Sequence, residues 1–490
     1  MKARELKQLH LILHFCSALG SSSMASRAQQ VKALPPPSRR LALVLCLIPA
    51  CYLGLYGLYG LAHFADYGSD LPRFLRYAAA PLVLSALFIA SGALLPTVRS
   101  SCIGLVACAS LLGLFAYEAV MSARLLLVIA GMFGTQIPGK EDPVNGSAGL
   151  PPAFTTKRMN DELGITRLDQ AVLGGLPSRN VVMCVSNGKP VFYKADRFGF
   201  NNPDELYEAP VDTIVIGDSF VEGHCLDRDQ SMVGRLRARR PHSIGLGMRG
   251  SGPLFELALL GRFALPLRPR TIVFVFFEGN DWENLRAEMT QSWLRPALTP
   301  NADFGSTDLP PVMIDRMTAV IDRWRRLRPS LWGVIWRNNF ARNFVALNHS
   351  ARLLGLAYPK VAPDEPGFVS ILARAKSLAS QSGARLILVY IPQVDRYEGF
   401  IDQQFVYDRL RERVLRGAAQ TGIETIDLAE EFDRHSNPAE LFAPDAHLSE
   451  AGADLAAELI NKGISLPPRN ALKIARGTHS GAQSIAKLLR

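Results

Sequence analysis

The hydrophobic positions of this chain are unevenly distributed: long apolar runs fill the region before residue 134, and shorter runs follow it. Residues 41–64 contain 24 residues without a formal charge, residues 77–95 form a second run, and residues 102–121 form a third that only Glu118 interrupts. A helix that crosses a membrane needs about 20 apolar residues. The pattern therefore predicts about three transmembrane helices within residues 41–133. A buried core helix is the alternative for any one of them.

Charges beside these runs predict how the chain is oriented in a membrane. No acidic residue lies between Met24 and the first run, which is preceded by Arg27, Lys32, Arg39 and Arg40. Because such basic clusters stay in the cytoplasm, we expect residues 1–40 to be cytoplasmic. Three crossings then place the chain after about residue 122 in the periplasm, with the helices in a bacterial inner membrane. We interpret residues 1–23, whose apolar stretch is too short to span, as an upstream extension.

After residue 211 the pattern changes to short apolar strands that alternate with amphipathic helices. The expected strands are residues 213–217, 243–246, 271–277, 385–391 and 423–427. The expected helices are residues 228–239, 253–264, 366–382, 404–421 and 449–462. Continuous apolar strands flanked by helices indicate a parallel sheet that is covered on both faces. Residues 211–465 are therefore predicted to form a three-layer α/β/α domain.

The remaining segments are less regular. Residues 134–210 have the composition of a linker, and they end in a hairpin signal of two β-rich runs around Asn187 and Gly188. A helical insertion at about residues 300–360 carries three tryptophans among arginines. We favour a helical cap packed over the domain, and an interfacial helix lying on the bilayer is the alternative. Residues 466–490 resemble a basic tail.

Composition narrows the partners of the chain. A net charge of +10 suits the vicinity of anionic lipid or polysaccharide, and no nucleic-acid motif accompanies it. Of seven cysteines, only Cys184 and Cys225 follow the membrane region, and they could pair in an oxidising compartment. No CxxC spacing suggests zinc, so neither a metal nor a cofactor is expected.

Candidate chemistry begins at Gly217-Asp218-Ser219-Phe220, directly after the first strand of the sheet. A serine at this turn exposes its hydroxyl at the edge of the sheet, and its own backbone N–H can face an oxyanion. The motif is not the GxSxG elbow of α/β-hydrolases, because Val221 replaces the second glycine. Alone, Gly-Asp-Ser is also ordinary turn chemistry.

Two further motifs follow the next two strands. Residues 245–252 (GLGMRGSG) satisfy GxGxxG, but no acidic residue follows at the distance that a dinucleotide site requires, so we reject that interpretation. Residues 278–281 (EGND) place Asn280 directly after a strand. Its side-chain amide could donate to a developing oxyanion.

The last motif is residues 444–452 (PDAHLSEAG), before the final helix, which Ser449 can cap. If this segment is extended, Asp445 and His447 face the same side, because alternate residues of a strand do so. The carboxylate could then orient the imidazole. Asp433 and His435 form a rival pair with the same spacing, but no sequence like HLSxxG follows them, so we favour His447.

Taken in order, these motifs resemble the SGNH/GDSL hydrolase superfamily of the bacterial membrane-anchored type, as does the stretch Asp196–Asn202. The resemblance implies a flavodoxin-like sheet, Ser219 as nucleophile, and His447 and Asp445 as base and acid. It also implies an oxyanion hole formed by Ser219, Gly250 and Asn280, with Asp218 and Asp281 in support. Two departures stand out: Gly279 immediately precedes Asn280, and Asp445 is one residue closer to His447 than the family pattern has it.

The function implied is a serine esterase that acts through an acyl-serine intermediate on an ester, expected to be an O-acyl or O-acetyl group of a cell-envelope carbohydrate. A lipid ester is another possible substrate. Two alternatives stay open. One is an O-acyltransferase for exported polysaccharide, which would need a separate acyl-donor or export partner. The other is a catalytically idle membrane protein that binds polysaccharide or an assembly partner.

Overall fold

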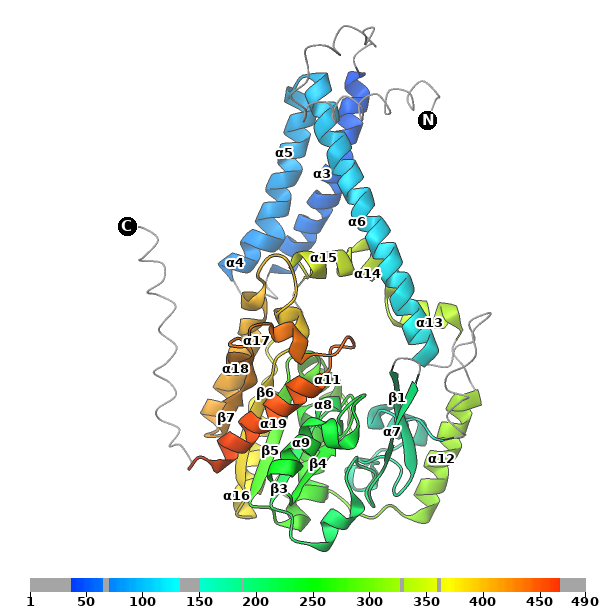
Figure 1. Cartoon of the computed structure of the whole chain (residues 1–490), viewed down its shortest axis with the longest axis vertical. Coiled ribbons are helices and arrows are strands. Elements are labelled where there is room, and N and C mark those ends of the chain that lie inside the picture. The colour runs from blue at the N-terminus through cyan, green and yellow to red at the C-terminus, as the bar shows by residue number, and fades with distance from the viewer. Residues whose placement is uncertain are drawn as a thin grey trace. The chain divides into compact units, whose positions relative to one another are not determined.

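The structure is a computed structural model that describes residues 37–64, 70–132, 150–186, 189–326, 330–358 and 363–467 (Figure 1). It divides into two compact units. The membrane unit comprises residues 1–126, 335–363 and 399–401, and the sheet unit comprises residues 127–334, 364–398 and 402–490. The predictions for residues 1–23, for the Asn187-Gly188 turn and for most of the basic tail lie outside the described residues.

The membrane unit contains three helices that are long and apolar enough to cross a membrane. The first is α3 (Arg39–Ala62), capped by Ser38. The second joins α4 (Leu71–Phe74), a π-helical turn (Leu75–Ala79) and α5 (Ala80–Leu94). The third, α6 (Thr97–Met132), is longer than the predicted run at both ends. A Cβ atom on Gly60 would lie 2.2 Å from the Tyr77 carbonyl, so glycine is required where α3 meets the second helix.

The predicted helical insertion is divided between the two units. In the sheet unit, α12 (Pro311–Arg326) packs on α7 (Thr156–Leu163) through Met317, Val320 and Ile321. In the membrane unit lie α14 (Phe340–Val345), α15 (Asn348–Leu354) and the end of α13 (Leu331–Arg337). A single helical cap over the sheet domain is therefore wrong for the second half of this segment, because its polar partners are on the membrane helices.

The sheet unit is built on five parallel strands, as the sequence predicts. They are β3 (Thr213–Gly217), β4 (Ser243–Gly247), β5 (Thr271–Phe277), β6 (Arg385–Ile391) and β7 (Glu424–Asp427). Their spatial order is β4-β3-β5-β6-β7, and every neighbouring pair is parallel. This is the flavodoxin-like order, so the predicted fold class is confirmed.

Both faces of the sheet are buried, which explains why its strands have continuous apolar sequences. Alternate residues such as Val273 and Val389 contact α9 (Met232–Arg239) and α19 (Glu450–Ser465), which lie side by side on one face (Figure 1). On the other face, Phe276 contacts Phe368. The helices of that face include α10 (Pro253–Leu259), α16 (Gly367–Gln381) and α17 (Gln404–Gln420). The remaining helices are α8 (Ser219–Glu222), α11 (Asp281–Glu288) and α18 (Leu428–Phe432).

Residues before the sheet are more ordered than their linker-like composition suggests. They include α7, whose Met159 and Leu163 are buried. The hairpin follows as antiparallel strands β1 (Asn180–Ser186) and β2 (Lys189–Lys194). Single helical turns complete the unit at Leu168–Gln170, Asp204–Glu208, Arg228–Gln230, Leu260–Ala264, Leu265–Leu267, Arg295–Leu298, Val394–Arg396 and Pro438–Leu441.

Candidate active site

Three of the predicted site residues lie in loops at the carboxyl edge of the sheet. Ser219 follows β3, Gly250 follows β4 and Asn280 follows β5. The chain passes from β3 to β4 on one side and then returns to β5 on the other, so the order of strands reverses at β3. Open α/β sheets bind ligands at this kind of reversal, where neighbouring loops diverge. The topology therefore brings these three loops to one edge.

Ser219 is the first residue of a helix rather than part of a long loop. The sequence suggested that a helix begins only near Arg228, but α8 starts at Ser219 because Asp218 caps it, accepting from the Phe220 N–H at 2.9 Å. The Ser219 hydroxyl lies 2.9 Å from His447 Nε2 and 3.3 Å from Asp218 Oδ2. Its single proton can serve one acceptor at a time, and His447 is the nearer.

His447 and Asp445 are held in a tight turn before α19. His447 Nδ1 lies 3.6 Å from Asp445 Oδ1, beyond hydrogen-bond range, while the His447 backbone N–H donates to the same oxygen at 3.2 Å. The predicted extended segment is wrong, because Ala446 has φ +70° and its N–H donates to the Ala443 carbonyl. The turn at Ala446 brings the Asp445 and His447 side chains together, and the alternation of side chains along a strand does not.

The alternative base, His435, has a different neighbour. Its exposed ring contacts the Asn437 carbonyl at 3.1 Å. It is His447 that contacts the Ser219 hydroxyl, across a separation of 228 residues.

A second imidazole, that of His224, lies beside His447 and was not predicted. The two ring centres are 4.2 Å apart, and His224 Nε2 is 3.7 Å from Asp445 Oδ2. Burial, followed by the charges of His447 and Arg249, lowers the pKa of His224 to about 3, so this ring is neutral at ordinary pH. No local motif marks His224, and only the fold brings it to Asp445.

His224, Asp445 and His447 are also the group, within the described part of the chain, that could hold a metal ion. Their ligand atoms all lie within 4.8 Å of one another. Two imidazoles and one carboxylate are ligand types that zinc accepts. The sequence showed no such site because the first histidine is more than 200 residues from the other two ligands.

Asp218 and Asp281 lie just after the neighbouring strands β3 and β5. Asp218 is buried, and burial raises its pKa to about 6 despite the hydrogen bond from Phe220. Asp281 is buried as well and accepts from the Phe277 N–H at 2.6 Å. Its pKa is raised well above the usual range, first by burial and then by Asp218 and Glu256. Both carboxyl groups thus fix the backbone beside Ser219 and Asn280.

The loops that carry Gly250 and Asn280 are tied to the Ser219 loop. Gly250 has φ +71°, a conformation that favours glycine. The Met248 N–H and the Ser251 hydroxyl both donate to the Gly217 carbonyl, at 3.1 and 3.2 Å. Asn280 is the N-cap residue of α11, whose Asn284 donates to the Ser251 carbonyl at 3.0 Å. The three loops therefore form one connected edge.

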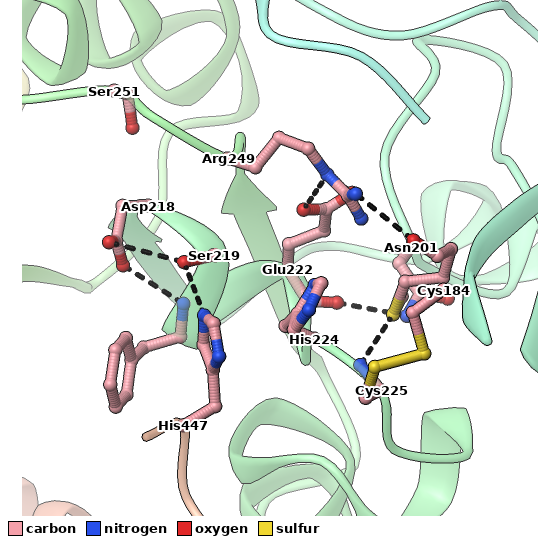
Figure 2. A network of polar contacts seen from close by, with 12 residues as sticks. Cys184, Asn201, Asp218, Ser219, Glu222, His224, Cys225, Arg249, Ser251 and His447 are labelled. Atoms are coloured by element: carbon pink, nitrogen blue, oxygen red, sulfur yellow. Dashed lines mark hydrogen bonds and ion pairs between the residues drawn. A yellow bond between two sulfur atoms is a disulfide. The ribbon is translucent and has the colours of Figure 1, made fainter. Parts of the chain in front are cut away.

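A partly buried ion pair lies beside this edge, and no motif of the sequence predicted it. Arg249 Nε lies 2.9 Å from Glu222 Oε2 (Figure 2). The same guanidinium donates to the Met183 carbonyl at 3.0 Å. Glu222 raises the pKa of Arg249 even though burial acts to lower it. The pair links α8, the loop after β4 and the hairpin.

The hairpin is joined to the same region covalently. Cys184 of β1 and Cys225, which follows α8, form a disulfide (Figure 2). The Asp196–Asn202 stretch also has a structural role here. Asp196 accepts from the backbone of Phe198 and Phe200, and Asn202 bonds both backbone groups of Gly245 in β4. This predicted motif therefore buttresses the sheet beneath the site.

A small pocket opens beside the Ser219 hydroxyl. Phe220 forms part of its wall, with its ring 4.0 Å from that of Phe277 and 5.0 Å from that of His447. Apolar side chains dominate the lining, which consists of Ser219, Phe220, Gly223, His224, Leu226, Met232, His447, Leu448 and Ala453. An acyl group suits such a wall better than a charged group does.

Comparison with known proteins identifies a family model that matches the sheet domain. Residues 215–455 match the model of the GDSL-like lipase/acylhydrolase family. The chain is similar to the lipase/acylhydrolase from Enterococcus faecalis, with 14% identity and a TM-score of 0.29 over 53% of this chain and 98% of that one. It is similar to TesA, with 15% identity and a TM-score of 0.27 over 52% and 98%.

A third solved structure is a two-domain esterase active on acetylated mannans, with 11% identity and a TM-score of 0.27 over 53% of this chain and 50% of that one. No curated protein matches the chain.

Proposed function

Because residues 215–455 form a domain of the GDSL-like lipase/acylhydrolase family, we propose that this protein is a membrane-anchored serine esterase with Ser219 as its nucleophile and His447 as its base. The observation that carries the proposal is the 2.9 Å contact between the Ser219 hydroxyl and His447 Nε2. A hydroxyl becomes a competent nucleophile when an imidazole within this range takes its proton.

In the first half of the reaction, His447 Nε2 accepts the proton of Ser219 as Oγ attacks the carbonyl carbon of the ester. The carbonyl oxygen becomes an oxyanion, for which the Ser219 and Gly250 N–H groups and the Asn280 amide are the proposed donors. When the intermediate collapses, the bond to the alkoxy group breaks and His447 returns the proton to the leaving alcohol. Water then hydrolyses the acyl-serine by the same steps, and Ser219 regains its proton.

Asp445 is the proposed acid that stabilises the protonated form of His447. Burial acts to raise the pKa of Asp445, but contacts with His447 outweigh it and lower the pKa below its usual value. The carboxylate therefore stays ionised while the imidazole carries a proton. Its 3.6 Å separation from Nδ1 makes this a charge contact that a bound substrate could tighten.

The proposed substrate is an O-acyl or O-acetyl group on a carbohydrate of the cell envelope. Three apolar helices would hold the enzyme at the membrane, close to such polymers. If a sugar hydroxyl replaces water in the second half of the reaction, the same site becomes an O-acyltransferase. A purely structural protein would have no need for the contact between Ser219 and His447. Incubation with an acetylated glycan would separate the first two, because hydrolysis releases free acetate and transfer does not.

We propose that the sheet unit lies in the periplasm. Arg39 and Arg40 are the first two residues of the first helix, and three crossings then carry the chain outwards. The pairing of Cys184 with Cys225 supports this location, since disulfides persist in oxidising compartments. Alkaline phosphatase fused after about residue 150 should be active in cells. An inactive fusion, together with an active cytoplasmic reporter at the same junction, would place the unit in the cytoplasm instead.

The nucleophile can be tested directly with a fluorophosphonate probe and with p-nitrophenyl acetate. Wild type should be labelled and should hydrolyse the ester, and Ser219→Ala should lose both activities while keeping its circular dichroism spectrum. Ser382→Ala, at the end of α16 and away from the site, is the matched control and should behave as wild type. Continued labelling of Ser219→Ala would assign the nucleophile to another residue.

A further inference from the structure

The segment of residues 331–357 presents large apolar side chains to its surroundings. Trp332 and Trp336 of α13 are 70% and 74% exposed, and they share one face of the helix because they are four residues apart. Val345 and Leu353, from α14 and α15, are 63% and 55% exposed. Single exposed apolar residues are ordinary, but two tryptophans on one face mark an interaction surface.

The charge of this segment has one sign. Residues 331–357 contain Arg337, Arg342 and Arg352 and no aspartate or glutamate. Tryptophan, with an apolar ring and one N–H donor, concentrates at the boundary between lipid and water. Arginine contributes attraction to anionic headgroups there. The composition therefore suits a lipid headgroup layer better than bulk water.

The segment is fastened to the membrane helices by a buried carboxylate. Glu118 of α6 is fully buried and accepts from the His349 N–H at 3.1 Å, the Ser350 N–H at 2.9 Å and the Ser350 hydroxyl at 3.1 Å. A carboxylate in an apolar helix is costly unless its oxygens are hydrogen-bonded. The start of α15 satisfies both oxygens, which explains why the third apolar run tolerates an acidic residue.

Tyrosines of the other two helices add further attachments. The hydroxyl groups of Tyr52 and Tyr56 donate to the carbonyls of Val345 and Leu356, at 3.1 and 3.3 Å. Tyr77 donates to the Ala357 carbonyl at 2.7 Å. All three membrane helices therefore hold the chain between residues 345 and 357.

The attachment points identify the end of the bundle concerned. Glu118 lies 21 residues after Thr97, and at 1.5 Å per residue this is about 30 Å, the thickness of the hydrocarbon core. Tyr56 lies in the last two turns of α3, and Tyr77 lies in the first two turns of the second helix. These positions coincide at the end of the bundle away from Arg39.

We propose that residues 335–357, which belong to the membrane unit, form an interfacial platform that lies in the lipid headgroup layer at this end of the membrane helices. Its lipid-facing residues are Trp336, Val345 and Leu353, with Trp332 one turn earlier on the same face of α13, and the bilayer that the helices cross is the partner. Phe400 extends the platform, because its N–H donates to the Leu353 carbonyl at 3.0 Å while its ring is exposed. The platform anchors the chain by a second, independent contact with lipid.

Quenching of tryptophan fluorescence by brominated lipids tests this proposal on the full chain. Wild type, Trp332→Phe/Trp336→Phe and the control Trp324→Phe would be reconstituted in phosphatidylcholine vesicles whose acyl chains carry bromine near the headgroup. Excitation at 295 nm avoids the tyrosines. Trp282 and Trp293 are buried in the sheet unit, and Trp324 bonds Glu162 there. We expect the double variant to lose most of the quenching that wild type shows, and Trp324→Phe to retain it.

Two outcomes would overturn the proposal. Equal quenching of wild type and the double variant would mean that other tryptophans meet the lipid. Absence of lipid quenching in wild type would also overturn it. Quenching by aqueous iodide would then mean that Trp332 and Trp336 lie in water, and absence of both kinds of quenching would mean that a protein partner or a second copy shields them. Ester turnover does not enter the measurement, so the result is independent of the proposed catalytic function.

Discussion

The two loops that meet at Ser219 are built in different ways. The loop after β3 is continuous with a helix: Asp218 caps α8, and both Asp218 and Ser219 are buried. The loop before α19 is a tight turn in which Ala446 takes a left-handed conformation and Asp445 is exposed. Backbone hydrogen bonds thus fix the hydroxyl, whereas the position of the imidazole depends on a short turn.

This difference predicts a gradient of mutational effects. The Ser219 hydroxyl is held by helix and strand geometry and no other group can replace it, so ester hydrolysis should be lost without it. The acid contacts His447 Nδ1 at 3.6 Å, compared with 2.9 Å between Nε2 and Ser219. The contact with the acid should therefore contribute less than the contact with the nucleophile.

The largest effect in this turn should follow loss of the base. General-base catalysis contributes roughly 100- to 10,000-fold, so His447→Ala should lower kcat on p-nitrophenyl acetate by at least about 100-fold. His435→Ala is the matched control, because its ring contacts only Asn437 in the described structure, and it should stay near wild type. A dead His435→Ala enzyme would move the base to the rival pair with Asp433.

Loss of the acid should be smaller. Asp445→Asn keeps the shape of the side chain and removes the charge that stabilises protonated His447. Since the contact is long, we expect kcat to fall by at most about 100-fold, the lower end of the general-base range. Steady-state kinetics on the same ester would measure the loss. A wild-type rate for Asp445→Asn would remove this residue from the mechanism.

The ring of His224 should matter through packing rather than through charge. It lies 4.2 Å from the ring of His447 and is neutral at ordinary pH. His224→Phe keeps a ring at this position and should retain most of the wild-type kcat. His224→Ala removes the support and should lower kcat, by less than the roughly 100-fold that a 1 Å misplacement of a catalytic group can cost. Equal losses in the two variants would mean that the contact of His224 with Asp445 matters instead.

The aspartates of the two loops should respond to pH with opposite signs. The pKa of folded Asp218 is about 6, above its usual 3.8, so its contribution to the free energy of unfolding falls as pH rises towards 6. The pKa of Asp445 is lowered, so its contribution is present above 3.8 and is lost as pH falls through its folded value.

Thermal unfolding of the detergent-solubilised chain between pH 2 and pH 7 would separate the two aspartates. Relative to wild type, Asp445→Asn should become less stable as pH rises towards 3.8, and Asp218→Asn should become more stable as pH rises from 3.8 to about 6. The same trend in both variants would contradict the assigned environments of the two carboxyl groups.

The smallest effect should come from Ala446. A left-handed conformation costs a non-glycine residue about 1 to 2 kcal/mol, and glycine avoids this cost. Glycine also loses more chain entropy on folding, which costs roughly 0.5 to 1 kcal/mol and offsets part of the gain. Ala446→Gly should therefore change the free energy of unfolding by no more than about 1 kcal/mol. A loss larger than this, measured by chemical denaturation, would mean that the turn depends on the alanine methyl group.

Much of the fold could be predicted because it depends on local patterns. The three apolar helices follow from the length of their runs, since bilayer thickness sets the number of residues needed. The strands were recognisable because a parallel sheet buries both faces, which makes their sequences continuously apolar. The motifs that follow these strands could be placed on one edge of the sheet, because parallel strands end at the same edge. The structure brings Ser219 and His447 into contact there.

Other features depend on contacts between segments that are far apart in the sequence. His224 reaches Asp445, Glu222 pairs with Arg249, and Cys184 joins Cys225, yet no spacing rule marks these pairs. The same holds for Glu118, which interrupts an apolar run and whose partner, Ser350, is 232 residues away in the sequence.

The sequence alone therefore determined the three apolar helices, the five strands of the sheet and which residue types stand at the strand ends, because periodicity and turn chemistry are local properties. Only the tertiary structure decided how the insertion at residues 311–357 divides between the two units, and which imidazole meets the serine. Those outcomes depend on the packing and hydrogen bonding of groups up to some 230 residues apart, and a local pattern carries no information about them.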